Sequence, residues 1–228
     1  AARICLNDLF TSFLTNCRFE SNAVQAGNGG CVLLQPGEPG VNLVYFQNCV
    51  FYDNKASDGF GGGLAAEGAN KLGLWLTNCT FFGNLAATES GGGIYANLMH
   101  TEYNTVFVEN SILWGNTVPQ IYDTADPNRP HVFVTYSDVE GGYSGEGNIG
   151  ENSSLHEPRF RDSTNGNLRL RYCFPCGDCS PCLDAARYTD VDGDVTDVND
   201  VGGTTEQTPW DIGKGPRLVD FPGETEVA

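Results

Sequence analysis

Basic residues are scarce in this chain of 228 residues. Lys and Arg together number 12 against 29 Asp and Glu, so the formal net charge at neutral pH is -17. Nucleic acid and anionic lipid are bound by Lys and Arg that neutralise phosphate, so this balance argues against both as ligands. We therefore expect no nucleic-acid partner. The acidic surface suits divalent cations or solubility instead.

Long apolar runs are also missing. No stretch of eighteen apolar residues occurs, so the sequence predicts no membrane span. No signal peptide is recognisable, because Ala1, Ala2 and Arg3 lead almost directly into repeat-like sequence. We expect a mature or trimmed chain, or part of a longer one. General disorder is excluded by a composition with 40% apolar and only 18% charged residues.

The chain does contain a short phrase that recurs four times. It begins at Asn16, Asn48, Asn78 and Asn110, with spacings of 32, 30 and 32 residues. A glycine-rich phrase falls between the copies, at Gly29-Gly30-Cys31-Val32, Gly61-Gly62-Gly63-Leu64 and Gly91-Gly92-Gly93-Ile94. Two interleaved motifs that repeat in register predict a solenoid, in which each repeat stacks on the next.

The pattern around each Asn predicts strands. Apolar residues lie two before the Asn, a polar residue follows them, and large apolar residues lie three after it. This period of two, with β-branched and aromatic residues, is typical of strands. The alternation resets at the Asn, which indicates a bend between two short strands.

A unit of about thirty residues with several short strands fits one coil of a parallel β-helix. We expect equivalent side chains of consecutive coils to stack at about 4.8 Å. Three columns follow: an apolar column, a small-residue column that continues in Ser111, and an amide ladder at a turn. The columns are Phe19, Phe51, Phe81 and Leu113; Cys17, Cys49 and Cys79; and Asn22, Asn54, Asn84 and Asn116.

The sequence therefore predicts an all-β protein, a right-handed, single-stranded parallel β-helix. We assign residues 1–171 to the coils and 172–228 to an irregular, Cys-rich and acidic C-terminal segment that packs on or extends the solenoid. A weaker fifth coil is expected where Val132, Val134, Tyr136 and Val139 match Val106, Val108, Asn110 and Leu113. A last strand is expected over residues 167–171.

The two phrases resemble the Gly-Gly-Ala-Ile and Phe-x-x-Asn repeats of polymorphic outer-membrane proteins. Phe19-Glu20-Ser21-Asn22, Phe51-Tyr52-Asp53-Asn54 and Phe81-Phe82-Gly83-Asn84 carry the second motif. The later motifs resemble secreted bacterial β-helix proteins with pectate-lyase-like folds and choice-of-anchor surface proteins. They are Tyr136-Ser137-Asp138-Val139-Glu140, Glu157-Pro158-Arg159-Phe160, Ser180-Pro181-Cys182-Leu183-Asp184 and Trp210-Asp211-Ile212-Gly213. The resemblance implies a secreted or surface-displayed β-helix, a fold that hosts lyases, adhesins and passive stalks.

No catalytic residues are predicted. Acidic residues recur at no fixed position of the regular coils, Lys occurs only at Lys55, Lys71 and Lys214, and the three His residues are isolated. The chemistry of glycosidases needs paired carboxylates. Six aromatics could line a sugar-binding face, although we expect about half of them to fill the core. They are Tyr45, Phe46, Trp75, Tyr95, Tyr103 and Trp114.

The nine cysteines form two groups. The odd number leaves at least one thiol free or paired between chains. The stacked Cys17, Cys49 and Cys79 are expected to act as small apolar residues, although the coil spacing also permits a bridge. The second group has a repeated Cys-x-x-Cys spacing, for which we favour local disulfides over zinc or an iron–sulfur cluster. It comprises Cys173, Cys176, Cys179 and Cys182.

Acidic residues gather near the C-terminus, with eleven between positions 184 and 226. Asp-x-Asp-Gly-Asp is the first half of a calcium loop, in which alternate carboxylates supply oxygen ligands. The twelfth position of an EF-hand would be Val201, so an EF-hand is excluded. A looser calcium site is the remaining hypothesis, beside that of a solvated acidic loop, and no organic cofactor is expected. Its candidate ligands are Asp190, Asp192, Asp194, Asp197 and Asp200.

These features together predict an extracellular or cell-surface structural or adhesive solenoid. Its stacked coils would make a stiff rod whose uncovered ends recruit further chains by strand addition. The expected partners are further copies of the chain, as in a filament, or other surface proteins and glycans. The alternative is an extracellular polysaccharide lyase or a glycan-binding module. Turnover of uronate-containing glycans, with and without Ca²⁺, separates the two hypotheses.

Overall fold

The structure is a computed structural model of the chain. It describes residues 2–6, 10–36, 41–68, 71–87, 91–99, 104–125, 130–151, 153–171 and 180–182. Strands dominate this part, which otherwise holds only a short α-helix, α1 (Ser153–His156), and a 3-10 turn, η1 (Ser163–Asn165). The prediction of an all-β fold is confirmed. The predicted boundary at residue 172 falls where few residues are described, so the division of the chain stays a prediction.

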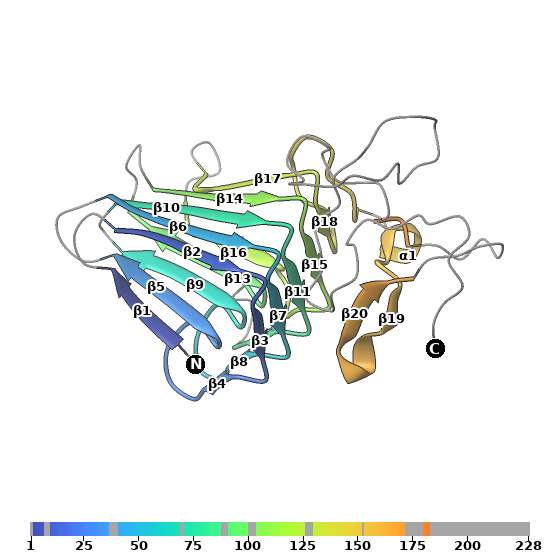
Figure 1. The fold of residues 1–228 in the computed structure, drawn as a ribbon, viewed down its shortest axis with the longest axis horizontal. Coiled ribbons are helices and arrows are strands. Elements are labelled where there is room, and N and C mark those ends of the chain that lie inside the picture. The colour runs from blue at the N-terminus through green and yellow to red at the C-terminus, as the bar shows by residue number, and fades with distance from the viewer. Residues whose placement is uncertain are drawn as a thin grey trace.

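Two five-stranded parallel sheets carry the first two strands of each coil, and Figure 1 shows that both run along the stack of coils. We name them sheets A and B. Sheet A consists of β1 (Ala2–Leu6), β5 (Val32–Pro36), β9 (Leu64–Gly68), β13 (Ile94–Leu98) and β16 (Ile121–Asp123). Sheet B consists of β2 (Phe10–Thr15), β6 (Val41–Gln47), β10 (Lys71–Thr77), β14 (Thr105–Glu109) and β17 (Val132–Thr135).

Two sheets of shorter strands complete the coils. Sheet C has five strands and sheet D has three. Sheet C consists of β3 (Arg18–Glu20), β7 (Val50–Tyr52), β11 (Thr80–Phe82), β15 (Ile112–Trp114) and β18 (Asp138–Val139). Sheet D consists of β4 (Ala23–Val24), β8 (Lys55–Ala56) and β12 (Leu85–Ala86).

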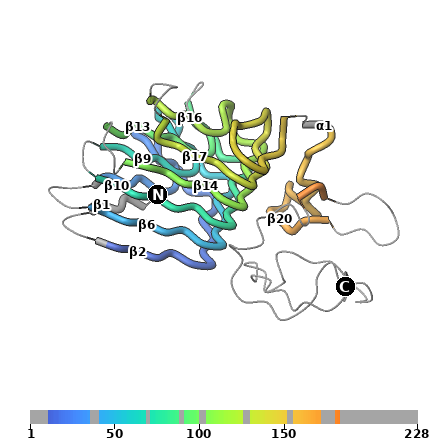
Figure 2. The backbone as a smooth tube through the Cα atoms, turned by 90° about the horizontal axis from the view of Figure 1, so that it is seen from above, coloured from blue at the N-terminus to red at the C-terminus, as the bar shows by residue number. Residues whose placement is uncertain are grey.

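The register of the sheets follows the sequence repeat. In sheet B, Leu14 pairs with Phe46, Phe46 with Leu76, and the column continues through Val108 to Val134. Equivalent strands of successive coils therefore lie side by side, as Figure 2 shows for β2, β6, β10, β14 and β17. The chain is a parallel β-solenoid, and the weaker fifth coil is confirmed because β17 and β18 pair with β14 and β15.

The bend predicted at each first Asn is present. Asn16, Asn48, Asn78 and Asn110 have φ between 49° and 54°, in the left-handed region, and each joins a sheet B strand to a sheet C strand. Asn tolerates this conformation better than most residues, because its short polar side chain bonds locally. Tyr136 takes the same place in the fifth coil, with φ 49°.

The glycine phrase marks the corner where coils approach most closely. A Cβ on Gly62 would lie 2.5 Å from the carbonyl oxygen of Leu85 in the next coil, so only glycine fits there. The preceding Gly61 has φ +64°, which also favours glycine. The glycine phrases thus allow sheet D of one coil to lead tightly into sheet A of the next.

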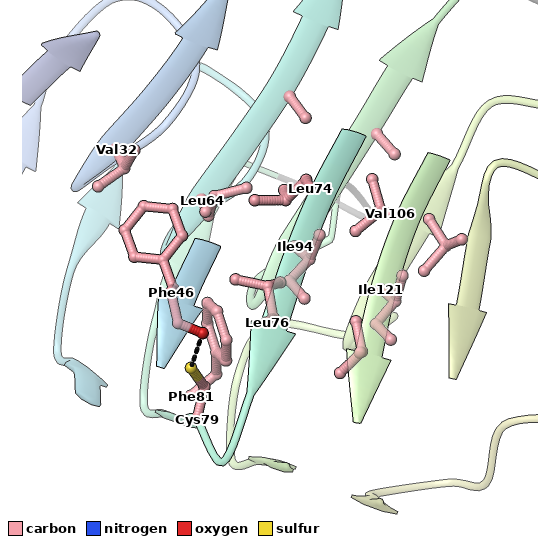
Figure 3. Close-up of a cluster of buried hydrophobic side chains, with 14 of the residues drawn as sticks. Val32, Phe46, Leu64, Leu74, Leu76, Cys79, Phe81, Ile94, Val106 and Ile121 are labelled. Atoms are coloured by element: carbon pink, nitrogen blue, oxygen red, sulfur yellow. Dashed lines mark hydrogen bonds between the residues drawn. The ribbon is translucent and has the colours of Figure 1, made fainter. Parts of the chain in front are cut away.

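The interior is a stack of mostly apolar side chains. Phe46, Phe51, Phe81, Leu74 and Leu76 are all at most 1% exposed. Figure 3 shows this core between the sheets, with the Cys79 thiol directed at the carbonyl oxygen of Phe46. Full burial of each such side chain contributes about 1.5–3 kcal/mol, so the columns are the main source of stability.

The described residues beyond the fifth coil do not form another parallel coil. The strand predicted near residues 167–171 exists as β20 (Asn167–Leu170), but it pairs antiparallel with β19 (Phe160–Asp162). This hairpin lies beside sheet C, as Figure 1 shows. The expectation that the strand would join the coil stack is therefore corrected by the structure.

Candidate functional site

The predicted apolar column is confirmed inside sheet C. The rings of Phe19 and Phe51 stack with centroids 4.9 Å apart, and those of Phe51 and Phe81 with centroids 4.3 Å apart. Leu113 pairs with Phe81 and continues the column to Val139 of the fifth coil. Phe51, Phe81 and Leu113 are fully buried, so this column is core and not a ligand surface.

The small-residue column is confirmed as a column of free thiols. Cys17, Cys49 and Cys79 form no disulfide, and neither does Cys31, which lies outside this column. The Cys49 thiol donates to the carbonyl oxygen of Leu14 at 3.3 Å, and Cys79 makes the equivalent bond to Phe46 at 3.5 Å. Hydrogen bonding with Cys79 and burial both raise the pKa of Cys49, which keeps it a neutral thiol.

Serine replaces cysteine in the later coils with the same geometry. The Ser111 hydroxyl donates to the carbonyl oxygens of Leu76 and Glu109. It also accepts from the backbone N–H of Cys79 at 3.0 Å, and Ser137 accepts from Ser111 at 3.1 Å. The column therefore works as a hydrogen-bonding position between coils, in which a thiol or a hydroxyl serves.

The amide ladder is also confirmed. The side-chain N–H of Asn22 donates to Asn54 at 3.0 Å, Asn54 to Asn84 at 2.9 Å, and Asn84 to Asn116 at 2.8 Å. The chain of bonds continues to Gln120 and ends on the Glu140 carboxylate. The asparagines also bond to backbone groups, so the ladder ties five coils together without providing a ligand site.

An aromatic ladder runs along the outer face of sheet B. Its rings stack face to face, with centroids 4.8, 4.7, 5.5 and 5.7 Å apart and planes inclined by 11° to 25°. Because each inner ring has a neighbour on both faces, the ladder presents mostly ring edges to solvent. We call these residues the outer ladder: Phe13, Tyr45, Trp75, Phe107 and Phe133.

Three members of the outer ladder were missed by the analysis of the sequence. Tyr45 and Trp75 were among the surface candidates, but Phe13, Phe107 and Phe133 were not. Every member lies three residues before the bend residue of its coil. That offset is the signal that could have identified the ladder, but it is blurred because Phe, Tyr and Trp alternate at the position.

The other aromatic candidates divide between interior and surface stacks. Phe46 fills the core, as expected for part of the set. Tyr95 stacks with Phe60 and Tyr122 along sheet A and is only 5% exposed, while Trp114 is 8% exposed. Tyr103 lies outside the described residues. None of the candidates that the structure describes offers an open ring face of the kind that sugars stack on.

The two ends of the solenoid differ in how well their core is covered. In the first coil, the inward-facing Ser12, Leu14 and Phe19 are all partly exposed. In the fifth coil, Val132, Val134 and Val139 occupy the same columns and are 2%, 1% and 1% exposed. The first coil therefore carries core positions that no described residue covers, whereas the last coil is sealed.

The seal of the last coil is a loop over residues 140–151. The side chain of Asn148 donates to the carbonyl oxygens of Val134 and Tyr143, and its own oxygen accepts from the backbone of Ser137. The Tyr143 ring packs against the core, and its burial, with a smaller effect from the Asp123 carboxylate, raises its pKa to about 12. This loop forms hydrogen bonds with backbone groups of the fifth coil that a further coil would otherwise pair with.

The β19–β20 hairpin covers the outer face of sheet C. The Arg18 guanidinium donates to the carbonyl oxygen of Gly166 at 3.0 Å, across 148 residues of sequence. The Tyr52 hydroxyl bonds to the carbonyl oxygens of Ser163 and Thr164, and Phe82 packs edge-on against Phe160. The chain thus returns from the last coil along three earlier ones and braces them.

Cys182 and Asp138 form a buried pair where the chain returns to the fifth coil. The thiol donates to Asp138 Oδ2 at 2.8 Å, and Asp138 Oδ1 has no hydrogen-bond partner among the described residues. Burial is the main cause that raises the pKa of Asp138 to about 7. Burial and the Asp138 charge raise the pKa of Cys182 as well.

This contact corrects one prediction. Cys182 was expected to join a disulfide, but its thiol is free because it serves as the hydrogen-bond donor to Asp138. The remaining disulfide candidates, Cys173, Cys176 and Cys179, lie outside the described residues. So do all five calcium candidates: Asp190, Asp192, Asp194, Asp197 and Asp200.

A second carboxylate, that of Asp123, accepts hydrogen bonds mainly from backbone N–H groups. Asp123 accepts from the N–H groups of His131 and Val132 at 2.7 and 3.0 Å, and from that of Ala125 at 3.0 Å. It also contacts the His131 ring at 3.1 Å. Sequence reasoning treated this histidine as isolated, and the structure gives it a partner whose role is to close the loop before β17.

The described residues contain no group of three or more His, Cys, Asp or Glu placed to hold a metal ion. No helix in this part is long and apolar enough to cross a membrane. No family model, curated protein or solved structure matches the chain. The unequal ends and the outer ladder are the most distinctive surfaces of the described part of the solenoid.

Proposed function

We propose that this chain is an extracellular or cell-surface structural solenoid that associates through its first coil. The observation that carries the proposal is the contrast between the ends. Equivalent inward-facing positions are partly exposed in the first coil and at most 2% exposed in the fifth. Uncovered apolar positions beside unpaired strand edges are what strand addition requires.

The composition of the first coil supports the same proposal. Strand β2 reads Phe-Thr-Ser-Phe-Leu-Thr and contains neither charge nor proline. The exposed edge strands of other proteins usually carry charged residues or proline, because Lys and Pro discourage pairing with another chain. A neutral edge on a chain of net charge -17 is therefore a place where two acidic molecules can meet with little repulsion.

Three buried free thiols are compatible with a location outside the cell. Cys49 and Cys79 are 0% exposed, and Cys31 is 1% exposed with a pKa raised to about 12 by burial. Oxidation requires an accessible thiolate, so these side chains resist it in an oxidising compartment.

The predicted calcium site would add a cation to the acidic C-terminal segment, and titration of the metal-free chain with Ca²⁺ by calorimetry tests it.

Lyase or glycan-binding activity is the alternative function. Sugar rings stack on open aromatic faces, whereas the outer ladder uses its faces between coils. Incubation with uronate-containing glycans, with and without Ca²⁺, tests this alternative. Release of unsaturated sugar would overturn the structural proposal.

Association is tested by sedimentation equilibrium of the whole chain over a wide concentration range. We expect reversible association that Thr15→Lys weakens, because this residue ends the uncovered edge strand. Thr135→Lys is the matched control, since Thr135 occupies the same column at the sealed end. A strict monomer at high concentration, or equal effects of the two variants, would contradict the proposal.

A further inference from the structure

We infer that two copies of this chain form a closed, two-fold symmetric dimer in which their β2 edges pair antiparallel around Phe13. The inference rests on the proposed function and names its partner as one second copy. It replaces the open filament expected from the sequence with an assembly that stops at two.

The difference between the two ends of the solenoid favours a closed dimer over an open filament. Head-to-tail stacking would place the first coil of one copy on the fifth coil of another. That fifth coil is occupied by the loop over residues 140–151, with Asn148 bonded to Val134 and Ser137. An association that uses only the first coil must be isologous, so it closes as a dimer.

The backbone of β2 is oriented for this pairing. The N–H of Asn16 donates to the carbonyl oxygen of Gln47 in the second coil at 2.9 Å. Across the same trans peptide, the carbonyl of Thr15 must point away from the second coil. Alternation along the strand then directs the N–H and C=O groups of Thr11, Phe13 and Thr15 to the uncovered edge.

A two-fold axis at Phe13 matches these groups to themselves. Phe13 then faces Phe13 of the second copy as a hydrogen-bonded pair, and Thr11 faces Thr15. Ser12 faces Leu14 on the inner side, so outward side chains meet outward ones and inward meet inward. No charged residue occurs in the paired segment, so the acidic chains meet without like charges opposed.

The outer ladder gives an independent reason to choose Phe13. One face of this ring stacks on Tyr45, yet the residue is 70% exposed, more than any other large apolar residue whose burial is described. The corresponding end residue at the sealed end, Phe133, is 43% exposed. Pairing at Phe13 lets the two ladders approach at their uncovered ends and removes this ring from water.

The test combines the mass in solution with two matched pairs of variants of the whole chain. Sedimentation equilibrium should give a species of twice the chain mass and nothing larger. Phe13→Lys should weaken this dimer more than tenfold, while Phe133→Lys should leave its dissociation constant within about twofold. Circular dichroism melting confirms that both variants fold.

Disulfide trapping tests the register without relying on loss of association. A hydrogen-bonded antiparallel pair holds its Cα atoms about 5.5 Å apart, which suits a disulfide. Mild oxidation of Phe13→Cys should therefore give a covalent dimer, and Phe133→Cys should not.

The outcomes separate this inference from the proposed function. A monomer at every concentration, with no trapping at position 13, overturns both. Species larger than a dimer, if Thr15→Lys suppresses their formation, would support the proposed function and overturn the closed dimer. A dimer unaffected by Phe13→Lys overturns the inference as well.

Discussion

Asparagine has two different roles within each coil. The first Asn of each phrase adopts a left-handed backbone conformation that turns the chain, while the second joins the buried amide ladder. Neither role involves solvent or ligand. The repeated asparagines therefore report on the stacking of coils, and their substitution tests that stacking.

Asn84→Ala should strongly destabilise the chain. Asn84 accepts from the backbone and side chain of Asn54 at 3.1 and 2.9 Å, so its loss leaves two buried donors without acceptors. We expect a loss of roughly 3–5 kcal/mol in the free energy of unfolding, at about 1–3 kcal/mol for each such group. Asn22→Ala, at the partly exposed start of the ladder, should cost about 1 kcal/mol. Urea unfolding compares the variants, and equal losses would contradict a continuous ladder.

The buried Asp138 makes stability depend on pH. Its pKa is about 7 in the folded chain, against 3.8 for the ordinary side chain. The folded state therefore holds the proton more tightly, and this contribution is complete below about pH 4 and lost as pH rises to about 7. The loss is on the order of 2–4 kcal/mol, from about 1.4 kcal/mol per pKa unit.

Asp138→Asn should remove that loss, because the amide carries no proton to lose and can still accept from the Cys182 thiol. Denaturant unfolding at several values between pH 4 and 8 compares the variant with the natural chain. We expect the natural chain to lose stability across this range relative to the variant. Parallel curves would show that Asp138 ionises freely and that the pair contributes nothing.

At the scale of elements, the corners and the hairpin determine how the coils fit. The glycine corners bring backbones into contact, and the β19–β20 hairpin braces the outer face of sheet C. These features act between coils, so local sequence alone does not define them. Each can be disturbed by a single substitution that leaves the strands themselves unchanged.

Gly62→Ala should destabilise the corner by about 3 kcal/mol or more, because its Cβ would meet the Leu85 backbone within 2.6 Å and overpacking is costly. Gly83→Ala is the control. Its Cβ would meet nothing nearer than 4.0 Å, so it bears only the cost of a left-handed conformation, about 1–2 kcal/mol. Thermal unfolding ranks the two variants, and the reverse order would refute the close approach.

Tyr52→Phe should loosen the hairpin without disturbing the coils. The hydroxyl bonds to the carbonyl oxygens of Ser163 and Thr164, and the pair of bonds is worth about 1 kcal/mol at a partly exposed site. We expect faster hydrogen exchange in β19 and β20 and unchanged exchange in β7. Tyr45→Phe, on the outer ladder, should leave the hairpin unchanged. Equal acceleration in both variants would mean that the hairpin does not depend on this contact.

The coils were predictable because identical residues recur at nearly constant spacing. The nearly constant spacing predicts the column of Phe19, Phe51 and Phe81 and the column of the four ladder asparagines. The outer ladder was only partly visible because three kinds of aromatic residue share its position. The hairpin and the Asp138–Cys182 pair could not be predicted, since contacts across 148 and 44 residues have no periodic signal.

At the scale of the whole molecule, the solenoid has a direction. Its last coil is sealed by a loop, and its first coil presents a neutral strand and a largely exposed aromatic ring. The hairpin braces the first three coils from the side. A repeated interior gives stiffness, and under the proposed function the difference between the ends decides how the rod associates. Function in this account belongs to an end of the molecule and not to a pocket.

Hydrogen exchange of β2 and β17 at low and high protein concentration tests this account most directly. Both strands lie in the same sheet at opposite ends, so each serves as the reference for the other. We predict that protection of the β2 amides rises with concentration while that of β17 stays constant. Protection of β2 that is the same at both concentrations would contradict association through the first coil.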